Sequence, residues 1–240
     1  MGHVTVVGGC RAKAPSTGIL ASSLAVGTTV KLMEGGTAVE YLVVNQGIPE
    51  NSSLYDASCD GTWLLRKDIH SERQWNTSDA NIYETSTINT WLNGDFFNSL
   101  GTTEQAVVKQ VKIPYRRGGS GGSDQSGANG LSCKVFLLSG YEVGWTTSDS
   151  SYFPVDGAKL DYFIASSYGD SKRIANLNGS ATGWLLRSPY TGDTGIVCFV
   201  GGNGSYYFGN ASISRGIRPA VILPSNALFD ETTMLLKGVA

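Results

Sequence analysis

The sequence predicts an α+β fold of short antiparallel strands, two helices and long loops. Three observations support this prediction. The apolar runs are brief and end at Gly, Asn, Asp or Ser, as short strands do. One segment repeats its apolar residues at helical spacing. Finally, 31 glycines and only 16% charged residues indicate many turns and a neutral polar surface.

The chain has 240 residues, which fits one β-rich domain or two small ones. We predict a single domain over residues 22–240, with ordered structure from Leu24. Met1 to Ala21 is small and turn-rich, and we expect it to be an N-terminal arm or linker that packs on another chain.

The first strands are predicted from a hairpin signal. Val30–Met33 and Val39–Val44 are apolar runs joined by the turn Glu34-Gly35-Gly36. Gly61–Arg66 is a further strand, and Val111–Tyr115 is another.

Two helices follow from residue spacing. Ser86 is a cap for a helix over about Thr87–Leu100, and a second, shorter helix is expected from Thr103 to Val108. The apolar stripe of the first helix consists of Ile88, Trp91, Leu92, Phe96 and Phe97.

The second half of the chain is read as short elements separated by loops. Arg117–Gly130 is Gly/Ser-rich and is predicted to be a mobile surface loop, with an inner part that looks like an engineered linker. Val135–Leu138 is expected to be a buried strand because it is apolar throughout. Leu160–Ala165 and Arg173–Leu177 are short elements, and Val221–Leu223 is a closing strand.

One internal similarity is present. Gly61–Arg66 and Thr182–Arg187 share the run Trp-Leu-Leu-Arg, which follows Gly-Thr in the first segment and Thr-Gly in the second. We interpret them as two matching strands of one sheet, with a duplicated domain as the alternative.

The tract Tyr190–Ser214 differs from its flanks. It is rich in Tyr, Phe, Asn, Ser, Asp and Gly, and it lies between the anchors Gly183–Pro189 and Arg215–Ala220. Recognition loops have this composition, because aromatic and small polar residues give contact area and adaptable hydrogen bonds. The sequence therefore favours binding over catalysis.

Composition argues against several other classes. The net charge is −2 and only Lys109–Arg117 is locally basic, so we expect no nucleic-acid partner. No apolar run approaches the length of a membrane span, and no secretion signal is recognised, so we expect synthesis in the cytoplasm and no membrane insertion. The four cysteines are widely spaced; Cys133 and Cys198 are expected to be buried, and a disulfide framework stays open.

Catalytic and metal patterns are weak. With two histidines and no Cys-x-x-Cys pair, we expect no metal and no cofactor. His70 lies in a loop between carboxylates and is interpreted as a solvated residue rather than a base. No nucleophile elbow or phosphate loop is recognised.

Four motifs in order resemble a known family. They are Ser86–Asn93, Val135–Ser139, Trp184–Pro189 and Gly216–Ala220. Together they resemble a domain of unknown function frequent in gut bacteria and their prophages, which is related to the C-type-lectin-like fold of formylglycine-generating-enzyme domains. The resemblance covers about Leu24 to Ser225.

The resemblance implies a display function. Members with this fold include the variable proteins of diversity-generating retroelements, in which a C-terminal region ending near a Gly-x-Arg motif is mutated at adenines. Trp184, Arg187, Ile217 and Arg218 would be scaffold, with the arginines bracing loop carbonyls or pairing with Asp156 or Asp161. The expected ligand-binding residues are Tyr190, Asp193, Phe199, Asn203, Tyr206, Tyr207, Phe208, Asn210 and Ser212. For the aromatic ones, filling gaps in the core is the alternative.

The sequence also departs from relatives with other functions. It lacks the Glu-Pro-Asn, Gln-Pro-Asp and Trp-Asn-Asp signatures expected of calcium-dependent lectins. It also has only Cys198 where formylglycine-generating enzymes use a cysteine pair. We therefore expect a non-enzymatic protein, phage- or prophage-encoded, that binds a host-surface protein or glycan on a virion or cell exterior. The alternatives are a capsid or tail decoration attached or self-associated through the arm and, third, an enzyme of the formylglycine-generating fold.

Overall fold

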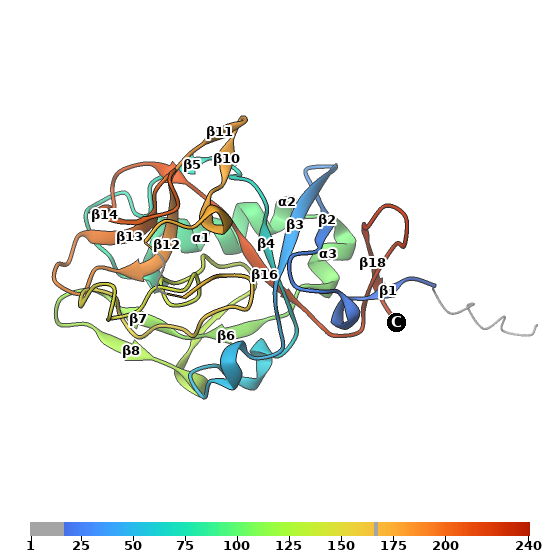
Figure 1. The fold of residues 1–240 in the computed structure, drawn as a ribbon, viewed down its shortest axis with the longest axis horizontal. Helices are drawn as coiled ribbons and strands as arrows, with labels where there is room; N and C mark the ends of the chain where they lie inside the picture. Colours follow the sequence, from blue (N-terminus) through green and yellow to red (C-terminus); the bar gives the residue numbers. More distant parts are fainter. Residues whose placement is uncertain (1–16, 166–167) are drawn as a thin grey trace, which may run out of the picture.

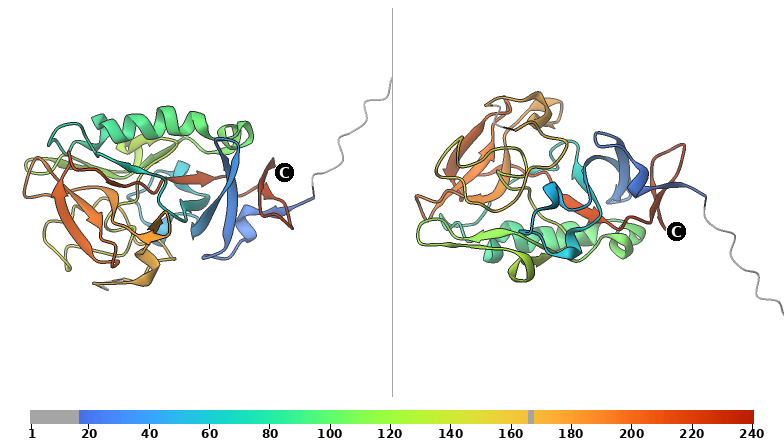
Figure 2. Two further views of the ribbon diagram at one scale, coloured as in Figure 1. Left: turned by 90° about the horizontal axis from the view of Figure 1, so that it is seen from above. Right: turned by 60° about the horizontal axis from the view of Figure 1, so that its bottom comes forward.

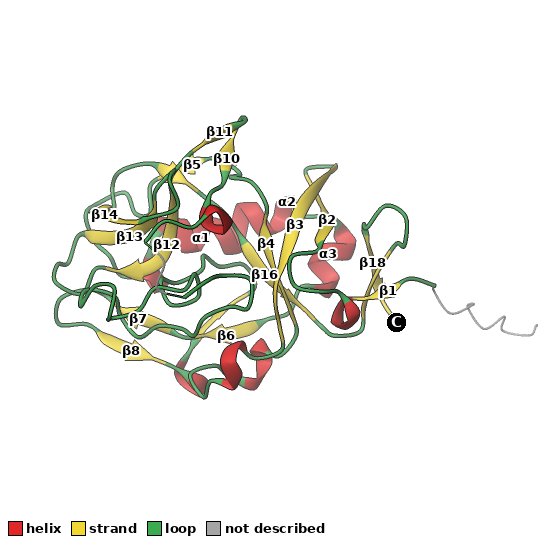
Figure 3. Ribbon diagram, in the orientation of Figure 1, coloured by secondary structure: helices red, strands yellow, loops and turns green. Residues whose placement is uncertain are grey.

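The computed structural model describes residues 17–165 and 168–240 and shows an α+β fold with mostly antiparallel sheets (Figure 1, Figure 3). One of its two larger sheets has the strand order β16-β4-β3-β2, all antiparallel. Its strands are β2 (Thr29–Glu34), β3 (Thr37–Gln46), β4 (Thr62–Arg66) and β16 (Ala220–Leu223). The predicted hairpin and the predicted strand before Lys67 are therefore confirmed.

The other large sheet has the order β14-β13-β12-β15-β5. Its strands are β5 (Glu72–Arg73), β12 (Trp184–Pro189), β13 (Ile196–Val200), β14 (Tyr206–Asn210) and β15 (Arg215–Gly216). Only the β12–β15 pair is parallel. The sheet thus brings both anchors and most of the tract between them into one structure.

A three-stranded sheet lies at the opposite end of the molecule from β13 and β14 (Figure 1). Its strands are β1 (Ile19–Leu20), β17 (Ala227–Phe229) and β18 (Leu236–Val239). Val221–Leu223 is therefore not the last strand. Most of the expected arm lies outside the described residues, but Ile19 pairs with Phe229, so its final residues belong to this sheet.

Three two-stranded sheets complete the strands of the described residues. They are β6 (Val111–Ile113) with β9 (Leu131–Cys133), β7 (Tyr115–Arg117) with β8 (Ser123–Gln125), and β10 (Asn176–Leu177) with β11 (Ser180–Ala181). Short 3-10 turns are η1 (Ala21–Ser23), η2 (Pro49–Asn51), η3 (Ala57–Cys59), η4 (Tyr83–Thr85), η6 (Gly127–Asn129) and η7 (Ser171–Arg173).

The predicted first helix is present and contains a π-helical turn. It runs through α1 (Thr87–Trp91), the π turn η5 (Leu92–Phe96) and α2 (Phe97–Ser99), and it lies along one side of both large sheets (Figure 2). The Ser86 hydroxyl caps it by accepting the N–H of Asn89 at 3.2 Å. The predicted second helix is α3 (Thr102–Val107).

A fully buried ion pair supports β12. All five N–H donors of Arg187 are used, two on the Glu142 carboxylate at 2.6 Å each and three on backbone carbonyls. The opposite charge and its hydrogen bonds raise the pKa of Arg187 despite its burial. Bracing of loop carbonyls is thus confirmed, whereas the carboxylate partner is Glu142 and not Asp156 or Asp161.

The other expected scaffold residues are buried as well. Arg218 donates to the carbonyls of Arg66 and Lys67 and stacks over Trp184, with its guanidinium carbon 4.7 Å from the ring centroid. Ile217 is fully buried beside it in the chain. Scaffold roles for Trp184, Arg187, Ile217 and Arg218 are confirmed.

The Gly/Ser-rich segment is not a structureless loop, so that prediction was wrong. It contains the β7–β8 hairpin, and Gly119 in the loop between these strands is buried and donates its N–H to the Asn81 side chain at 2.9 Å. A Cβ built on Gly119 would stand 1.9 Å from the Asp193 carbonyl oxygen. Glycine is required here by close backbone approach, and the resemblance to a flexible linker is accidental.

Two further expectations need correction. Val135–Leu138 is buried throughout but is not a strand, because only Phe136 pairs, with Ala220. The similar segments Gly61–Arg66 and Thr182–Arg187 belong to different sheets, as β4 and β12. They share burial of their Trp-Leu-Leu run rather than a common sheet.

Candidate functional site

The tract singled out by composition forms the β13–β14 hairpin at one edge of the five-stranded sheet. Antiparallel pairing sets Phe199 opposite Tyr207 and Cys198 opposite Phe208. Because successive side chains of a strand point to opposite faces, these two pairs lie on different faces of the hairpin. The turn is closed by Gly204, whose φ of +78° favours glycine.

One face carries an aromatic cluster. Phe208 contacts Phe153, Tyr190 and Tyr206, with ring centroids 4.8 to 5.7 Å apart. Tyr206 also packs on the buried Trp145 and donates its hydroxyl to the Asp149 carbonyl at 3.0 Å. The inner rings of this cluster therefore belong to the core.

The outer part of the same cluster reaches solvent. Tyr152 stacks on Tyr190 with centroids 4.3 Å apart and is 44% exposed, and Tyr168 packs edge-on against Tyr206 and is 60% exposed. Sequence reasoning did not include these two tyrosines in the site. They come from loops before the tract, and only their aromatic type in a polar context could have indicated them.

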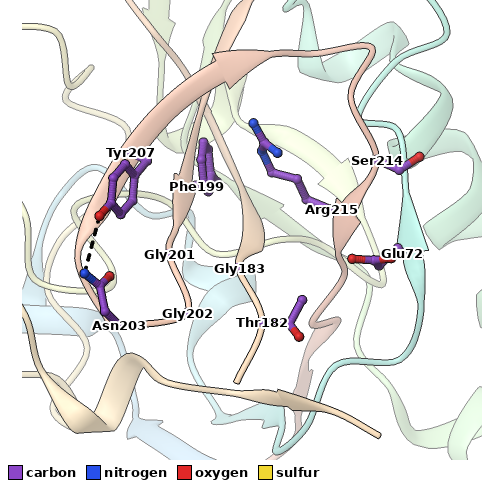
Figure 4. Close-up of a pocket in the computed structure, with 10 residues that line it drawn as sticks. All are labelled: Glu72, Thr182, Gly183, Phe199, Gly201, Gly202, Asn203, Tyr207, Ser214 and Arg215. Atoms are coloured by element: carbon purple, nitrogen blue, oxygen red, sulfur yellow. Dashed lines mark hydrogen bonds between the residues drawn. The ribbon is translucent and has the colours of Figure 1, made fainter. Parts of the chain in front are cut away.

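The opposite face carries a stack of planar groups. The rings of Tyr207 and Phe199 stack with centroids 5.6 Å apart, and the guanidinium carbon of Arg215 lies 3.9 Å from the Phe199 centroid. Asn203 in the turn donates its amide to the Tyr207 hydroxyl at 3.3 Å. These side chains line a cavity of about 400 Å³, into which Glu72 and Thr182 also point (Figure 4).

A polar rim connects the hairpin to the segment before the first helix. The Asp79 carboxylate accepts the Asn210 amide at 2.9 Å and the Ser212 N–H at 3.1 Å, and these hydrogen bonds lower its pKa. The Asp193 carbonyl accepts the Asn81 amide at 2.9 Å. Asp193, Asn210 and Ser212 are thus held together along one edge.

None of the nine expected residues is buried, but they do not form one surface. Asp193, Asn203, Tyr207 and Asn210 are exposed, and the others are partly exposed. Three of them pack against the core, namely Phe199, Tyr206 and Phe208. For these three, the alternative that the aromatic rings fill gaps in the core holds in part. The structure separates the set into the aromatic cluster, the cavity face and the polar rim.

Two side chains that were considered for catalysis lie in surroundings that alter their chemistry. Burial raises the pKa of the Cys198 thiol well above its usual value, so the reactive thiolate is disfavoured. His70 is only partly solvated: its ring contacts Trp91 and Phe96, and burial lowers its pKa. No group of three His, Cys, Asp or Glu side chains suited to a metal ion occurs in residues 17–165 and 168–240.

The cysteines within the described part of the chain, Cys59, Cys133 and Cys198, are free and buried, as expected for the latter two. Cys10 lies outside it. The same residues contain no helix that is both long and apolar enough to span a membrane.

Comparison with known proteins adds one finding. The model of a family described as a domain of unknown function (DUF6273) matches residues 60–225, which include every residue of the hairpin, the cavity and the rim. No curated protein and no solved structure matches the chain.

Proposed function

The chain belongs to the DUF6273 family of domains of unknown function, and from this premise we propose that it is a non-enzymatic protein that binds a host-surface molecule through the β13–β14 hairpin. The observation that carries the proposal is the exposure of large aromatic rings around the hairpin. Tyr152, Tyr168 and Tyr207 are 41 to 60% exposed on a frame that is otherwise closely packed. Exposed tyrosines with a polar rim are typical of binding surfaces.

The frame beneath these rings supports the proposal. Arg187 fixes β12 from the inside with all its donors, and the hairpin pairs with β12 along the β13 edge. A ligand would therefore meet side chains that are already oriented. Such preorganisation reduces the entropy lost on binding.

The position of the hairpin is also compatible with display. The sheet of β1, β17 and β18 lies at the far end of the molecule (Figure 1). Attachment of that end to a virion or another carrier would leave the hairpin free, and repeated copies would strengthen weak contacts by avidity. This arrangement accommodates a decoration role together with binding.

We further propose that the fold is C-type-lectin-like and that the hairpin region is diversified by a retroelement. Support comes from the exposed Tyr, Asn and Asp positions before Gly216 and Arg218. The neighbouring DNA tests it directly: a reverse transcriptase gene and a near-copy of the coding region for residues 190–214 are expected. Related sequences that never differ at these positions would contradict diversification.

Binding is tested with the labelled full chain presented as a tetramer to a panel of gut bacterial cells, by flow cytometry. The triple variant Tyr152→Ala, Tyr168→Ala, Tyr207→Ala is expected to lose about tenfold or more in apparent affinity, because exposed aromatic residues contribute most to such contacts. The matched control, Leu20→Ala with Val239→Ala, changes similarly exposed apolar residues at the far end.

The control variant is expected to bind as the unchanged protein does. Absence of binding to every cell type, or equal loss in both variants, would contradict the proposal. Thermal unfolding of each variant shows that a loss of binding is not a loss of fold.

A further inference from the structure

Arg215 is held in place without being neutralised. Its guanidinium carbon lies 3.9 Å from the centroid of the Phe199 ring, and Arg215 forms no ion pair and no side-chain hydrogen bond within the described part of the chain. Its Nε is buried and has no acceptor. Its two Nη groups are not enclosed in this way and have no acceptor among the described residues, so they are the donors that an acceptor in the cavity could meet.

Two glycines keep the guanidinium and its neighbours in this arrangement. A Cβ on Gly209 would stand 2.4 Å from Nη2 of Arg215, and a Cβ on Gly201 would stand 2.5 Å from the Tyr207 ring. Neither contact is possible without movement of the side chain. The floor of the cavity therefore depends on residues that leave room for the stack.

The other groups in the cavity suit hydroxyl groups. Glu72 is exposed and forms no ion pair or side-chain hydrogen bond among the described residues, so its carboxylate is free to accept. Asn203 and the Tyr207 hydroxyl lie at the opposite wall, and Thr182 points in from below (Figure 4). Tyr207, which is 41% exposed, also offers an apolar ring face.

We propose that this cavity binds a sugar that carries a carboxylate, with the carboxylate on Arg215, the hydroxyls on Glu72 and Asn203, and the apolar face of the sugar ring on Tyr207. The planar fork of a guanidinium matches a carboxylate in two hydrogen bonds. A cavity of about 400 Å³ has the size of a small-molecule site.

The proposal rests on the proposed binding function and specifies its ligand, because Phe199, Asn203 and Tyr207 belong to both. The test is calorimetric titration of the full chain with three acidic sugars, glucuronic acid, galacturonic acid and N-acetylneuraminic acid. Glucose and galactose serve as matched neutral sugars. At least one acidic sugar is expected to bind about tenfold or more tightly than its neutral counterpart, as for a charge-assisted hydrogen bond.

Three variants locate the binding. Arg215→Met keeps an unbranched apolar stem and removes the charged guanidinium, and it is expected to lose about tenfold or more in affinity. Gly209→Ala retains every polar group but displaces the guanidinium, so a similar loss is expected. Leu20→Ala with Val239→Ala, at the far end of the molecule, is expected to leave sugar affinity unchanged.

The outcomes separate this proposal from the function on which it rests. No binding of any acidic sugar, equal binding of neutral sugars, or an unchanged affinity in Arg215→Met would overturn it. Arg215-dependent binding of glutamate or glycine but not of sugars would also overturn it, by assigning the cavity to amino acids. In each case, continued cell binding that depends on the exposed tyrosines would leave the proposed function standing.

Discussion

Arg187 and Arg215 are both arginines of the five-stranded sheet, and their surroundings are opposite in kind. On β12, Arg187 is fully buried and uses all five donors on the protein itself. On β15, Arg215 lies over the Phe199 ring beside Gly209 and keeps its donors unpaired among the described residues. The difference separates a guanidinium that holds the fold from one that is available to a ligand.

The same difference extends to the acids beside them. Glu142 is buried and accepts from Arg187, from the Tyr55 hydroxyl at 2.9 Å and from the Ser139 N–H at 3.0 Å. Glu72 next to β15 is exposed and accepts nothing within the described residues. A buried ion pair is costly to break, whereas charged side chains that have no partner cost little to alter.

The largest expected effect comes from breaking the buried pair. Arg187→Met should lower the free energy of unfolding by about 3–5 kcal/mol, because Glu142 is left charged and uncompensated in the interior. Arg215→Met should change it by less than about 1 kcal/mol, because no partner is lost. Urea denaturation of both variants measures the contrast.

Similar losses in the two variants would remove the distinction between them. As a control, Arg187→Met with Glu142→Gln removes both charges of the buried pair. The double variant is expected to recover part of the stability lost in the single one.

The buried network also predicts a dependence on pH. Burial raises the pKa of the Asp156 carboxyl to about 7, and its Oδ1 has no hydrogen-bond partner among the described residues. The folded protein therefore keeps this proton to higher pH than the unfolded chain does. The contribution of Asp156 to stability is greatest below pH 4 and is lost as the pH rises through about 7.

Asp156→Asn isolates this contribution, because the amide oxygen can still accept the Ser188 hydroxyl that now donates to Asp156 at 2.7 Å. We expect the free energy of unfolding of the variant, relative to the unchanged protein, to rise by about 2–4 kcal/mol between pH 4 and pH 8. Denaturation at several pH values measures it. A constant difference between the two proteins would show that Asp156 does not titrate in this range.

Local signals in the sequence were sufficient to predict several elements of the fold that supports the hairpin. The Glu34-Gly35-Gly36 turn, the Ser86 cap and the apolar run of β16 each depend on neighbours in the chain, and all are present. The scaffold roles of Arg187, in β12, and Arg218, between β15 and β16, were expected from the family resemblance. The identity of the partner did not, because Glu142 is 45 residues from Arg187 in the chain and lies in a loop without a pattern.

The candidate site was predicted as one surface because amino-acid composition does not tell to which face of a strand each side chain points. Alternation along β13 and β14 would have placed Phe199 and Tyr207 on one face and Phe208 on the other, once the pairing register was known. The register depends on the Gly201–Ser205 turn, which composition alone left open. Gly119 shows the same limit, since its close contact with Asp193 joins distant parts of the chain.

The smallest expected effect distinguishes the two faces of the hairpin. Phe208→Ala should lower the free energy of unfolding by about 1–3 kcal/mol, because the partly buried ring packs on Phe153, Tyr190 and Tyr206. Tyr207→Ala should lower it by less than about 0.5 kcal/mol, because that ring is exposed and its hydroxyl has a single hydrogen-bond partner, Asn203, among the described residues. Thermal and urea unfolding of the two neighbouring variants provide the comparison. Equal losses would mean that Tyr207 supports the hairpin as Phe208 does, and the cavity face would then be part of the frame rather than a surface kept open for a ligand.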